Sequence, residues 1–296
     1  IMKNVLVDIV LASYNGEKYI SEQLDSILNQ SHKNIQLYIS DDGSSDTTVN
    51  IINEYVRKDS RVHLINMERV GGVIKNFETA LEYTTANYIM LSDQDDFWEY
   101  NKIEKQLNAM LTEERKAGNV AVLGYTDLAL VDDKLQPISR SFYRAAGLNP
   151  ERNLHYCNLS WMGSVMGCTI IMNRKALDNA IPFHPQVIMH DHWLAMKTLE
   201  IGHLFYIDES LIQYRQHSKN VSGGLGYRKS ILKKILDIDA YKKIIERAKI
   251  VSSMHGLDSF YKRLKFSKNI IAGFKYCETV KYPFLFLFFF ITLGGK

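Results

Sequence analysis

The sequence has few of the residues that would indicate a disulfide framework or a zinc module. Its 296 residues include three cysteines, Cys157, Cys168 and Cys277, and none belongs to a CxxC or Cys/His spacing. Such a number and scatter are typical of a protein from a reducing compartment. No GxGxxG motif follows the first apolar segment, which argues against a dinucleotide-dependent oxidoreductase.

The sequence also lacks an apolar run long enough to cross a membrane. The run from Pro283 to Leu293, PFLFLFFFITL, has eleven residues, and as a helix it would extend about 16 Å, against about 30 Å for a bilayer core. We expect this tail to anchor the chain at a membrane surface without spanning it. The apolar start of the chain has no small-residue cleavage site and leads directly into a polar turn, so we expect a β-strand there, not a signal peptide.

Charge is distributed unevenly along the chain. The net charge is +3, but residues 221–296 hold 15 Lys/Arg and 5 Asp/Glu, whereas residues 1–220 hold 21 and 28. A basic region that ends in an apolar run indicates attraction to anionic lipid headgroups, and nucleic acid is the weaker interpretation.

Apolar runs of strand length alternate with segments of helical period through the first half. This pattern predicts an α/β fold with a doubly wound, mostly parallel sheet. The expected strands cover residues 5–11, 35–40, 62–65 and 88–91, and a helix is expected after each of them. Ligands of such sheets bind where the strands end, so polar clusters at those points are candidate site residues.

The second half of the chain is less regular. We expect a long loop over residues 137–161, a strand over 168–172, a helix over 190–200 and a strand over 211–215. From residue 227 onward, lysine-rich segments predict two or three surface helices. The expected organisation is a catalytic domain over residues 1–225 and a basic helical region over residues 226–296.

Three acidic clusters follow apolar runs or begin a predicted helix. They are Asp41-Asp42, the segment Asp93 to Asp96, and Asp191 in the sequence MHDHW. Carboxylates this close are unfavourable unless a cation or hydrogen-bond donors offset them. Mg²⁺ or Mn²⁺ fits a carboxylate cluster without a His/Cys cage. The alternative is that these aspartates cap a helix that begins near Trp98.

Seven motifs in a fixed order resemble glycosyltransferase family 2, which has the GT-A fold. Between Val10 and Gly223 they read VLASYNGEKYI, SDDGSSDTT, GGVIKNF, LSDQDDFW, MGCTIIMN, MHDHW and YRQHSKNVSG. The resemblance is strongest to bacterial polysaccharide rhamnosyltransferases. His192 departs from that branch, which commonly has an aromatic residue there, and this leaves the acceptor or the sugar less defined.

The resemblance implies a nucleotide-binding role for several residues. Ser13, Tyr14 and Asn15 would wall the base, and Asp41 would accept a hydrogen bond from its imide, which leaves Asp42 structural. Lys75 would contact the base or a phosphate, with a solvated lysine as the alternative.

The resemblance also implies the catalytic roles. Asp95 would bind the metal directly, and Asp93 would contact the ribose or bind the metal through water. Arg215 and His217 would hold the diphosphate, and His217 is a possible metal ligand. Asp191 would be the general base, with a helix cap as the alternative.

Trp161 has two interpretations. The segment from Trp161 to Cys168 is expected to shape the sugar pocket, because sugars stack on aromatic rings; alternatively, Trp161 belongs to the core.

The resulting expectation is an inverting transferase that moves L-rhamnose from dTDP-L-rhamnose to a lipid-linked polysaccharide precursor. A UDP-sugar-dependent galactosyl- or glucosyltransferase is the alternative. A non-catalytic sugar-nucleotide-binding subunit is disfavoured by the presence of Asp93, Asp95 and Asp191. The expected location is the cytoplasm, with peripheral attachment to the inner face of the cell membrane.

Overall fold

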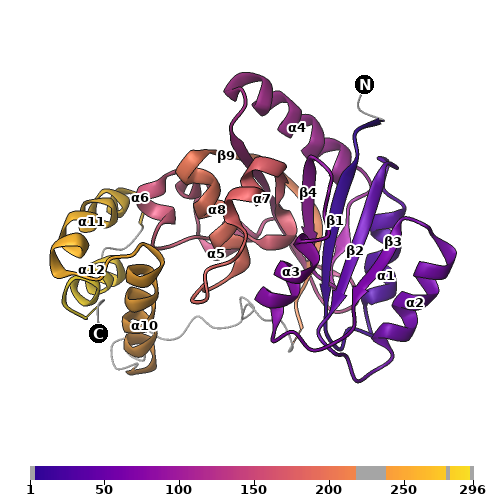
Figure 1. Ribbon diagram of the computed structural model, residues 1–296, viewed down its shortest axis with the longest axis horizontal. Coiled ribbons are helices and arrows are strands. Elements are labelled where there is room, and N and C mark those ends of the chain that lie inside the picture. The colour runs from indigo at the N-terminus through magenta and orange to yellow at the C-terminus, as the bar shows by residue number, and fades with distance from the viewer. Residues whose placement is uncertain (1–3, 218–237, 278–280, 294–296) are drawn as a thin grey trace.

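The computed structural model describes residues 4–217, 238–277 and 281–293. A nine-stranded mixed sheet forms its centre, with helices on both faces and a layer of three helices at one end (Figure 1). The strand order is β3-β2-β1-β4-β8-β6-β9-β5, and β7 pairs with β6. The strands are β1 (Val7–Ser13), β2 (Ile35–Asp41), β3 (Val62–Asn66), β4 (Tyr88–Ser92), β5 (Phe97–Trp98), β6 (Ala121–Val131), β7 (Pro137–Ser139), β8 (Ile171–Asn173) and β9 (Gly202–Arg215).

The helices that pack on this sheet precede the C-terminal layer. They are α1 (Ile20–Leu28), α2 (Thr48–Lys58), α3 (Val73–Leu81), α4 (Lys102–Ala117), α5 (Phe142–Ala146), α6 (Tyr156–Leu159), α7 (Arg174–Ala180) and α8 (His190–Ile201), with short 3₁₀ turns η2 (Pro150–Leu154) and η3 (Gly167–Thr169).

Alternation along β1 divides the core into two layers. Val10 and Ala12 belong to one cluster with side chains of α3, α7 and α8. Val7, Ile9 and Leu11 belong to the other, with side chains of α1, α2 and α4. Successive strand residues point to opposite faces, so one fully apolar strand supplies both layers.

Parallel and antiparallel pairs meet in the middle of the sheet. β1 is parallel to β2 and β4, and β2 is parallel to β3. β8 is antiparallel to β4 and β6, and β6 is parallel to β9. The α/β prediction is confirmed, but the sheet is mixed: among the described strands, four pairs are parallel and four are antiparallel. The carboxyl ends of the parallel strands β1, β2 and β4 lie at one edge.

The predicted long loop over residues 137–161 is wrong. It contains β7, α5, η2 and α6, each of five residues or fewer. Ser141 caps α5 by accepting the amide N–H of Arg144, and Asn149 caps η2 by accepting that of Glu151. Elements this short depend on such caps and give no periodic signal. Two further differences from the prediction are β6, which was not predicted, and the first nine residues of β9, which extend the predicted strand toward its start.

The capping alternative for Asp93 to Asp96 is also wrong. β5 follows these residues directly, and α4 begins at Lys102 with Asn101 at its N-cap. The carboxylates therefore belong to the loop between β4 and β5 and need another explanation.

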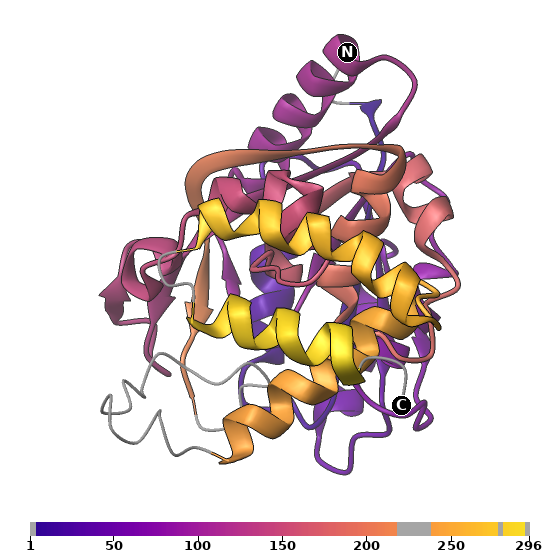
Figure 2. The ribbon, with the colours of Figure 1, turned by 90° about the vertical axis from the view of Figure 1, so that its left-hand side faces the viewer.

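Three helices form the C-terminal layer: α10 (Ile238–Met254), α11 (Phe260–Gly273) and α12 (Lys281–Leu293), with the turn η4 (Phe274–Tyr276) after α11. Figure 2 shows α12 between α10 and α11. Their shared core contains Trp161, Phe286 and Phe290, and the Trp161 ring stacks on Phe286 at 5.1 Å between centroids. The core interpretation of Trp161 is therefore confirmed. The expected boundary at residue 225 lies outside the described residues.

The apolar tail forms α12, which carries aromatic rings on both its buried and its exposed face. One face of α12 packs into the layer through Phe286 and Phe290, while Phe284 and Phe288 are more than half exposed. Within the described parts of the chain, no helix is both long and apolar enough to cross a membrane.

The layer contacts the rest of the protein where α11 meets α6. A Cβ atom at Gly273 would lie 2.6 Å from the carbonyl oxygen of Cys157, so only glycine permits this approach. The same oxygen accepts a hydrogen bond from the Trp161 indole at 2.9 Å. Cys277 donates from its sulfur to the Gly273 carbonyl at 3.6 Å.

Candidate active site

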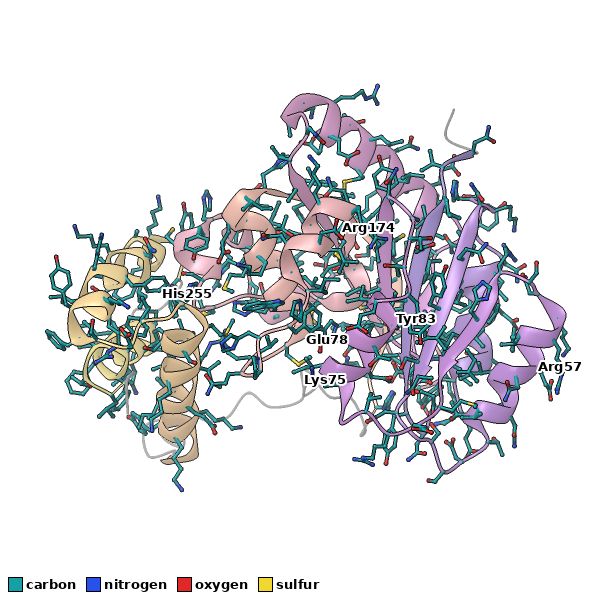
Figure 3. All side chains as sticks on the ribbon, viewed as in Figure 1. Arg57, Lys75, Glu78, Tyr83, Arg174 and His255 are labelled. Carbon is teal, nitrogen blue, oxygen red and sulfur yellow. The ribbon has the colours of Figure 1, made fainter. Side chains whose placement is uncertain are left out.

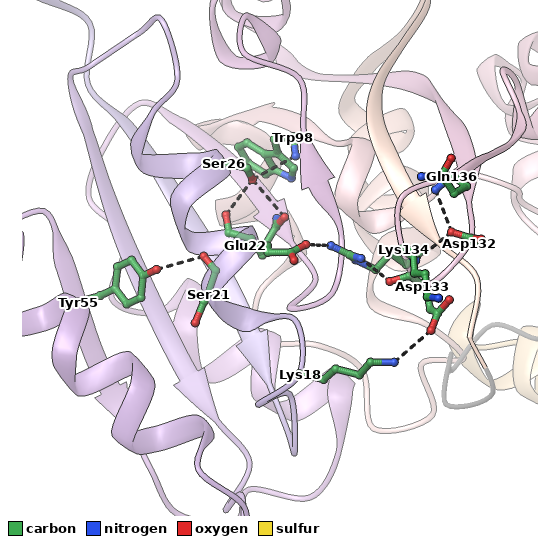
Figure 4. Close-up of polar contacts among 12 residues, drawn as sticks. Lys18, Ser21, Glu22, Ser26, Tyr55, Trp98, Asp132, Asp133, Lys134 and Gln136 are labelled. Atoms are coloured by element: carbon green, nitrogen blue, oxygen red, sulfur yellow. Dashed lines mark hydrogen bonds and ion pairs between the residues drawn. The ribbon is translucent and has the colours of Figure 1, made fainter.

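A cavity of about 1050 Å³ opens at the carboxyl ends of β1 and β4. We call it the catalytic cavity. The turn after β1, the acidic loop after β4, the start of α8 and the end of β9 all contribute to its wall. Ser13, Tyr14, Asn15, Asp93, Asp95, Asp191 and His217, all predicted site residues, line it. Lys18 and Asp133 pair at 3.3 Å at its edge (Figure 4).

The turn after β1 is fixed by hydrogen bonds to distant segments. Asn15 has a positive φ of 47° and accepts the Ser45 amide N–H at 2.9 Å. The Tyr14 backbone donates to Gln94 at 2.8 Å and accepts from its amide at 3.0 Å. The Tyr14 ring lies 5.6 Å from the Arg69 guanidinium. An exposed ring, a cation and fixed backbone groups suit a flat, polar ligand.

The two adjacent aspartates at the end of β2 match the expectation only in part: Asp41 does not line the cavity, whereas Asp42 has the hydrogen bonds of the expected structural role. Asp41 is fully buried, does not line the catalytic cavity, and accepts hydrogen bonds from Ser13 and Ser44 at 2.7 Å. Asp42, expected to be structural, lines the cavity. Burial acts to raise its pKa, but the amides of Val70 to Gly72 outweigh burial and lower it.

Lys75 lies outside the cavity wall. It forms an ion pair with Glu78 on its own helix (Figure 3). Arg69, in the segment that follows β3, lines the cavity with its cationic side chain, and its role was not predicted from the sequence. The sequence feature that could have indicated Arg69 is its position just before Gly71-Gly72, because a glycine pair predicts a tight turn.

Asp93, Asp95 and His217 form the charged centre of the cavity. The Asp95 carboxylate lies 2.8 Å from Nε2 of His217, whose ring stacks on Tyr19 at 5.2 Å. Burial, together with the charges of Asp95 and Asp191, raises the pKa of Asp93 to about 7. Where the structure describes the chain, neither Asp93 nor Asp95 pairs with a lysine or an arginine. The chemistry of these oxygens and one imidazole suits a divalent cation such as Mg²⁺ or Mn²⁺. Among the described residues, however, only Asp93 of the three belongs to a group whose ligand atoms all lie within 4.8 Å of one another.

A second group of potential ligands lies deeper. Oxygen atoms of Asp93 and Asp96 and the sulfur of Cys168 lie within 4.8 Å of one another. Burial raises the pKa of both Asp96 and Cys168, which favours the protonated thiol, a poor ligand for a hard cation. Beside them burial lowers the pKa of Lys102 to about 7. This group supports the acidic loop from behind.

Asp191 lies in the first turn of α8 and faces the cavity. Its two oxygens accept the amide N–H of His192 at 2.6 Å and that of Gly167 at 3.1 Å. Burial raises its pKa to about 6, although these amides act in the opposite direction. The N-cap of α8 is Met189. Asp191 therefore binds one free amide of the helix start and still presents a carboxylate with the basicity of a catalytic base.

The histidines on either side of Asp191 are neutral. His190 stacks on Phe77 at 4.1 Å, and burial lowers its pKa to about 3. His192 donates from Nε2 to the Leu159 carbonyl at 2.6 Å, and burial, with the charge of Arg247, lowers its pKa to about 4. Neither ring adds positive charge beside Asp191. His192, the departure from the rhamnosyltransferase branch, is largely buried and also lines the catalytic cavity.

Arg215 lies behind the cavity wall, not in it. It is 2% exposed, forms an ion pair with Glu22 (Figure 4) and donates to the Asp133 carbonyl at 2.8 Å. Its guanidinium lies 4.7 Å from the Tyr19 ring, on which His217 stacks. The expected contact with a diphosphate is not available to it, and it supports His217 through Tyr19 instead.

The acidic loop at the carboxyl end of the central strand β4 and the buried carboxylate of Asp191 line one cavity. Residues 8–179 match the family described as Glycosyl transferase family 2, and the chain belongs to this family.

Relatives and a solved structure agree with this assignment. The chain is 31% identical over 245 residues to the Escherichia coli UDP-Glc:alpha-D-GlcNAc-diphosphoundecaprenol beta-1,3-glucosyltransferase WfaP, covering 81% of this chain and 90% of WfaP. It is 28% identical over 230 residues to the dTDP-rhamnosyl transferase RfbG of Shigella flexneri, covering 72% and 73%. The mannosyltransferase PcManGT from Pyrobaculum calidifontis, solved with GDP-Man and Mn²⁺, superposes with a TM-score of 0.54 at 16% identity, covering 98% of this chain and 70% of PcManGT.

Proposed function

We propose that this glycosyltransferase moves L-rhamnose, with inversion, from dTDP-L-rhamnose to a hydroxyl of a lipid-linked polysaccharide precursor. The observation that carries the proposal is the pairing, in one cavity, of the acidic loop with Asp191, whose pKa is raised to about 6 by burial. The first supplies a place for a charged leaving group, and the second supplies a base.

In this proposal the nucleobase binds among Ser13, Tyr14 and Asn15, with Asp42 and Arg69 beside it. Asp42, not Asp41, is the carboxylate within reach of a ligand in the cavity. Arg69 offers its guanidinium to the base or to a phosphate, the role that Lys75 was expected to have.

Asp95, Asp93 and His217 would hold a divalent metal. When bound, such an ion supplies Lewis-acid stabilisation of the charge that develops on the leaving diphosphate. The stacking of His217 on Tyr19, which Arg215 supports from behind, fixes the imidazole beside Asp95.

Asp191 would remove the proton of the attacking hydroxyl. The acceptor oxygen forms a bond to the anomeric carbon as the bond from that carbon to the diphosphate breaks, and the proton passes to the Asp191 carboxylate. The amides of Gly167 and His192 orient this carboxylate. One displacement inverts the anomeric configuration, so no covalent intermediate on the protein is required.

A UDP-glucose-dependent transferase is the second candidate, because WfaP is 31% identical to the chain. The rhamnose assignment is supported by the DQDD and YRQH motifs and by the similarity to RfbG. A panel of dTDP-L-rhamnose, UDP-glucose and UDP-galactose separates these candidates. The true donor should raise the melting temperature most and be hydrolysed slowly without acceptor.

The proposed acceptor and location are linked. A lipid-linked acceptor is supported by the similarity to WfaP, which is named for a diphosphoundecaprenol-linked acceptor. In this proposal, residues 226–296 would hold a catalytic domain over residues 1–225 at the inner face of the membrane. Exposed apolar side chains of α11 and α12 support this attachment: Phe260, Tyr261, Leu264, Ile271, Tyr282, Phe284 and Phe288. Exposed lysines of α11, including Lys265 and Lys268, lie among them and favour anionic lipid.

The decisive test is the Asp191→Asn variant. We expect transfer to fall by about 10² to 10⁴ while donor affinity stays near normal, because the base acts in the chemical step. Asp95→Ala is the contrast, and it should lose metal-dependent donor binding as well. If the folded Asp191→Asn variant transfers sugar at the wild-type rate, Asp191 only stabilises the start of α8, and the proposed mechanism is wrong.

A further inference from the structure

A second cavity, of about 410 Å³, lies between α10 and α12. We call it the apolar groove. Its walls include the apolar side chains of Trp161, Ile244, Ile250, Pro283 and Phe286, together with the exposed Lys243 and Glu246. The two helices that form it lie side by side in Figure 2. Ile188 and Arg247 line both the apolar groove and the catalytic cavity, so the two spaces adjoin.

Arg247 lies at this junction, and its contacts among the described residues leave its charge without a carboxylate partner. Its Nε donates to the Trp161 carbonyl at 2.8 Å, and within residues 4–217, 238–277 and 281–293 no carboxylate pairs with it. Burial lowers its pKa, and its charge contributes to lowering that of His192. Arg247 is partly exposed and lines both cavities, so a negatively charged ligand in either of them can reach its guanidinium.

We propose that the apolar groove and Arg247 bind the lipid-diphosphate part of the acceptor. The isoprenoid segment nearest the diphosphate fills the groove, the diphosphate pairs with Arg247, and the sugar extends into the catalytic cavity toward Asp191. This proposal rests on the proposed function, which supplies the lipid-linked acceptor. Guanidinium groups bind phosphates with charge-assisted, often paired hydrogen bonds.

The order of features along the two cavities matches this ligand better than others. An apolar groove, a cation and a carboxylate base follow one another, as a polyprenyl chain, a diphosphate and a sugar follow one another in the acceptor. A membrane acyl chain would fill the groove but leave Arg247 without an anion. Beyond the groove, the exposed Phe284 and Phe288 of α12 give the rest of the chain a direct path to the bilayer.

The first experiment measures binding of farnesyl diphosphate to the full chain by calorimetry. We expect binding that Arg247→Met weakens by at least about tenfold, the effect of losing one charge-assisted hydrogen bond. Ile250→Asp, which places a carboxylate in the groove, should weaken it similarly. Lys249→Met, an exposed lysine of the same helix, is the matched control and should bind as the wild type does. Farnesol and inorganic diphosphate, each half of the probe, should both bind more weakly.

Equal binding by the wild type and Arg247→Met overturns the proposal, as does binding of inorganic diphosphate as tight as that of farnesyl diphosphate. If Ile250→Asp does not fold, Arg247→Met alone decides the outcome.

A kinetic experiment separates this proposal from the proposed function. Arg247→Met should raise KM for a sugar linked to farnesyl diphosphate and leave KM for the methyl glycoside of that sugar unchanged. Equal loss with both acceptors means that Arg247 acts through His192, and the groove assignment fails. If the wild type binds farnesyl diphosphate through Arg247 but transfers no sugar, the proposed function fails and the binding site remains.

Discussion

At the scale of single residues, Asp191 is subject to two opposing influences. Burial raises its pKa to about 6, from an ordinary value of 3.8, while the amides of Gly167 and His192 stabilise its charged form. The result is a carboxylate that is charged at neutral pH yet basic enough to accept a proton from a hydroxyl as it attacks.

The pH dependence of the reaction should report this pKa. We expect kcat/KM to rise about tenfold per pH unit below pH 6 and to level off above it, because the base must be deprotonated. Stability should follow the opposite course. The folded pKa exceeds the unfolded one, so Asp191 contributes stability below about pH 4, and this contribution is lost as pH rises through about 6.

Melting temperatures of Asp191→Asn and the wild type, measured at pH 4.5 and pH 7.5, test the stability part. The difference between the two proteins should move in favour of the variant at the higher pH. A difference that is independent of pH would mean that Asp191 titrates in the folded protein as it does in water.

Gly167 controls the position of the same carboxylate. A Cβ atom there would lie 2.7 Å from Nε2 of His190 and 3.6 Å from Cβ of Asp191. We expect Gly167→Ala to push the start of α8 away from the cavity and lower kcat by about tenfold to a hundredfold, with donor affinity unchanged. Adding His190→Ala makes room for the new methyl group and should restore part of kcat. Independent, additive effects of the two substitutions would exclude this contact as the cause.

Two single residues show where the sequence pattern stops being informative. Asp41 and Asp42 are adjacent and chemically equal, and their side chains leave the end of β2 in different directions. Which one faces a ligand depends on the segment from Val70 to Gly72, whose amides bind Asp42. That is a tertiary contact, and no local pattern encodes it.

At the scale of elements, the helices and strands that could be predicted from the sequence are the long ones with a regular apolar pattern. β1 to β4 and the first helices have apolar runs or helical spacing that reflect their buried faces, and they were predicted close to their observed bounds. β6 is buried almost throughout and carries Thr126 and Asp127 within it, so its pattern resembled the start of a loop. Ser141 and the amides of Phe142 and Tyr143 bind the Asp127 side chain, which makes a buried carboxylate acceptable in a strand.

The helix α12 has one buried face and one exposed face, and substitutions on the two faces should affect stability differently. Phe290 is fully buried, and Phe288, two residues earlier, is 54% exposed. Phe290→Ala should lower the free energy of unfolding by about 3–5 kcal/mol through the cavity that it leaves. Phe288→Ala should change it by no more than about 0.5 kcal/mol. Urea unfolding of both variants checks this, and similar values for the two would show that α12 does not pack in this register.

At the scale of the whole molecule, the charge asymmetry and the exposed rings of the helical layer favour one orientation at a membrane. The charge asymmetry and the apolar tail in the sequence predicted attachment to a membrane surface, and this stays a prediction. The sequence could not predict that one face of the apolar tail packs against Trp161, because Trp161 lies far from the tail in the chain. Nor does any local signal connect Arg247 of α10 with the catalytic cavity.

Vesicle binding tests the orientation. The double variant Phe284→Ser/Phe288→Ser should weaken binding to anionic vesicles by at least about tenfold, since burying one Phe side chain is worth roughly 1.5–3 kcal/mol. Raising the salt concentration should weaken binding further by screening the lysines of α11. Tyr83→Ser removes a ring of similar exposure, 51%, from the catalytic domain and should have no effect (Figure 3). Equal losses in both proteins would mean that the membrane contacts another face.

The contact between α6 and α11 is bordered by two native cysteines, whose thiols can report on it. Cys157 and Cys277 are partly exposed and border the Gly273 contact from its two sides, while Cys168 is buried in the sheet region behind the acidic loop. A maleimide added to the native protein would therefore react first at the seam between the helical layer and the catalytic domain. Because both thiols are already partly exposed, the labelling rate would report changes in the exposure of that seam, and no engineered cysteine is needed to measure it.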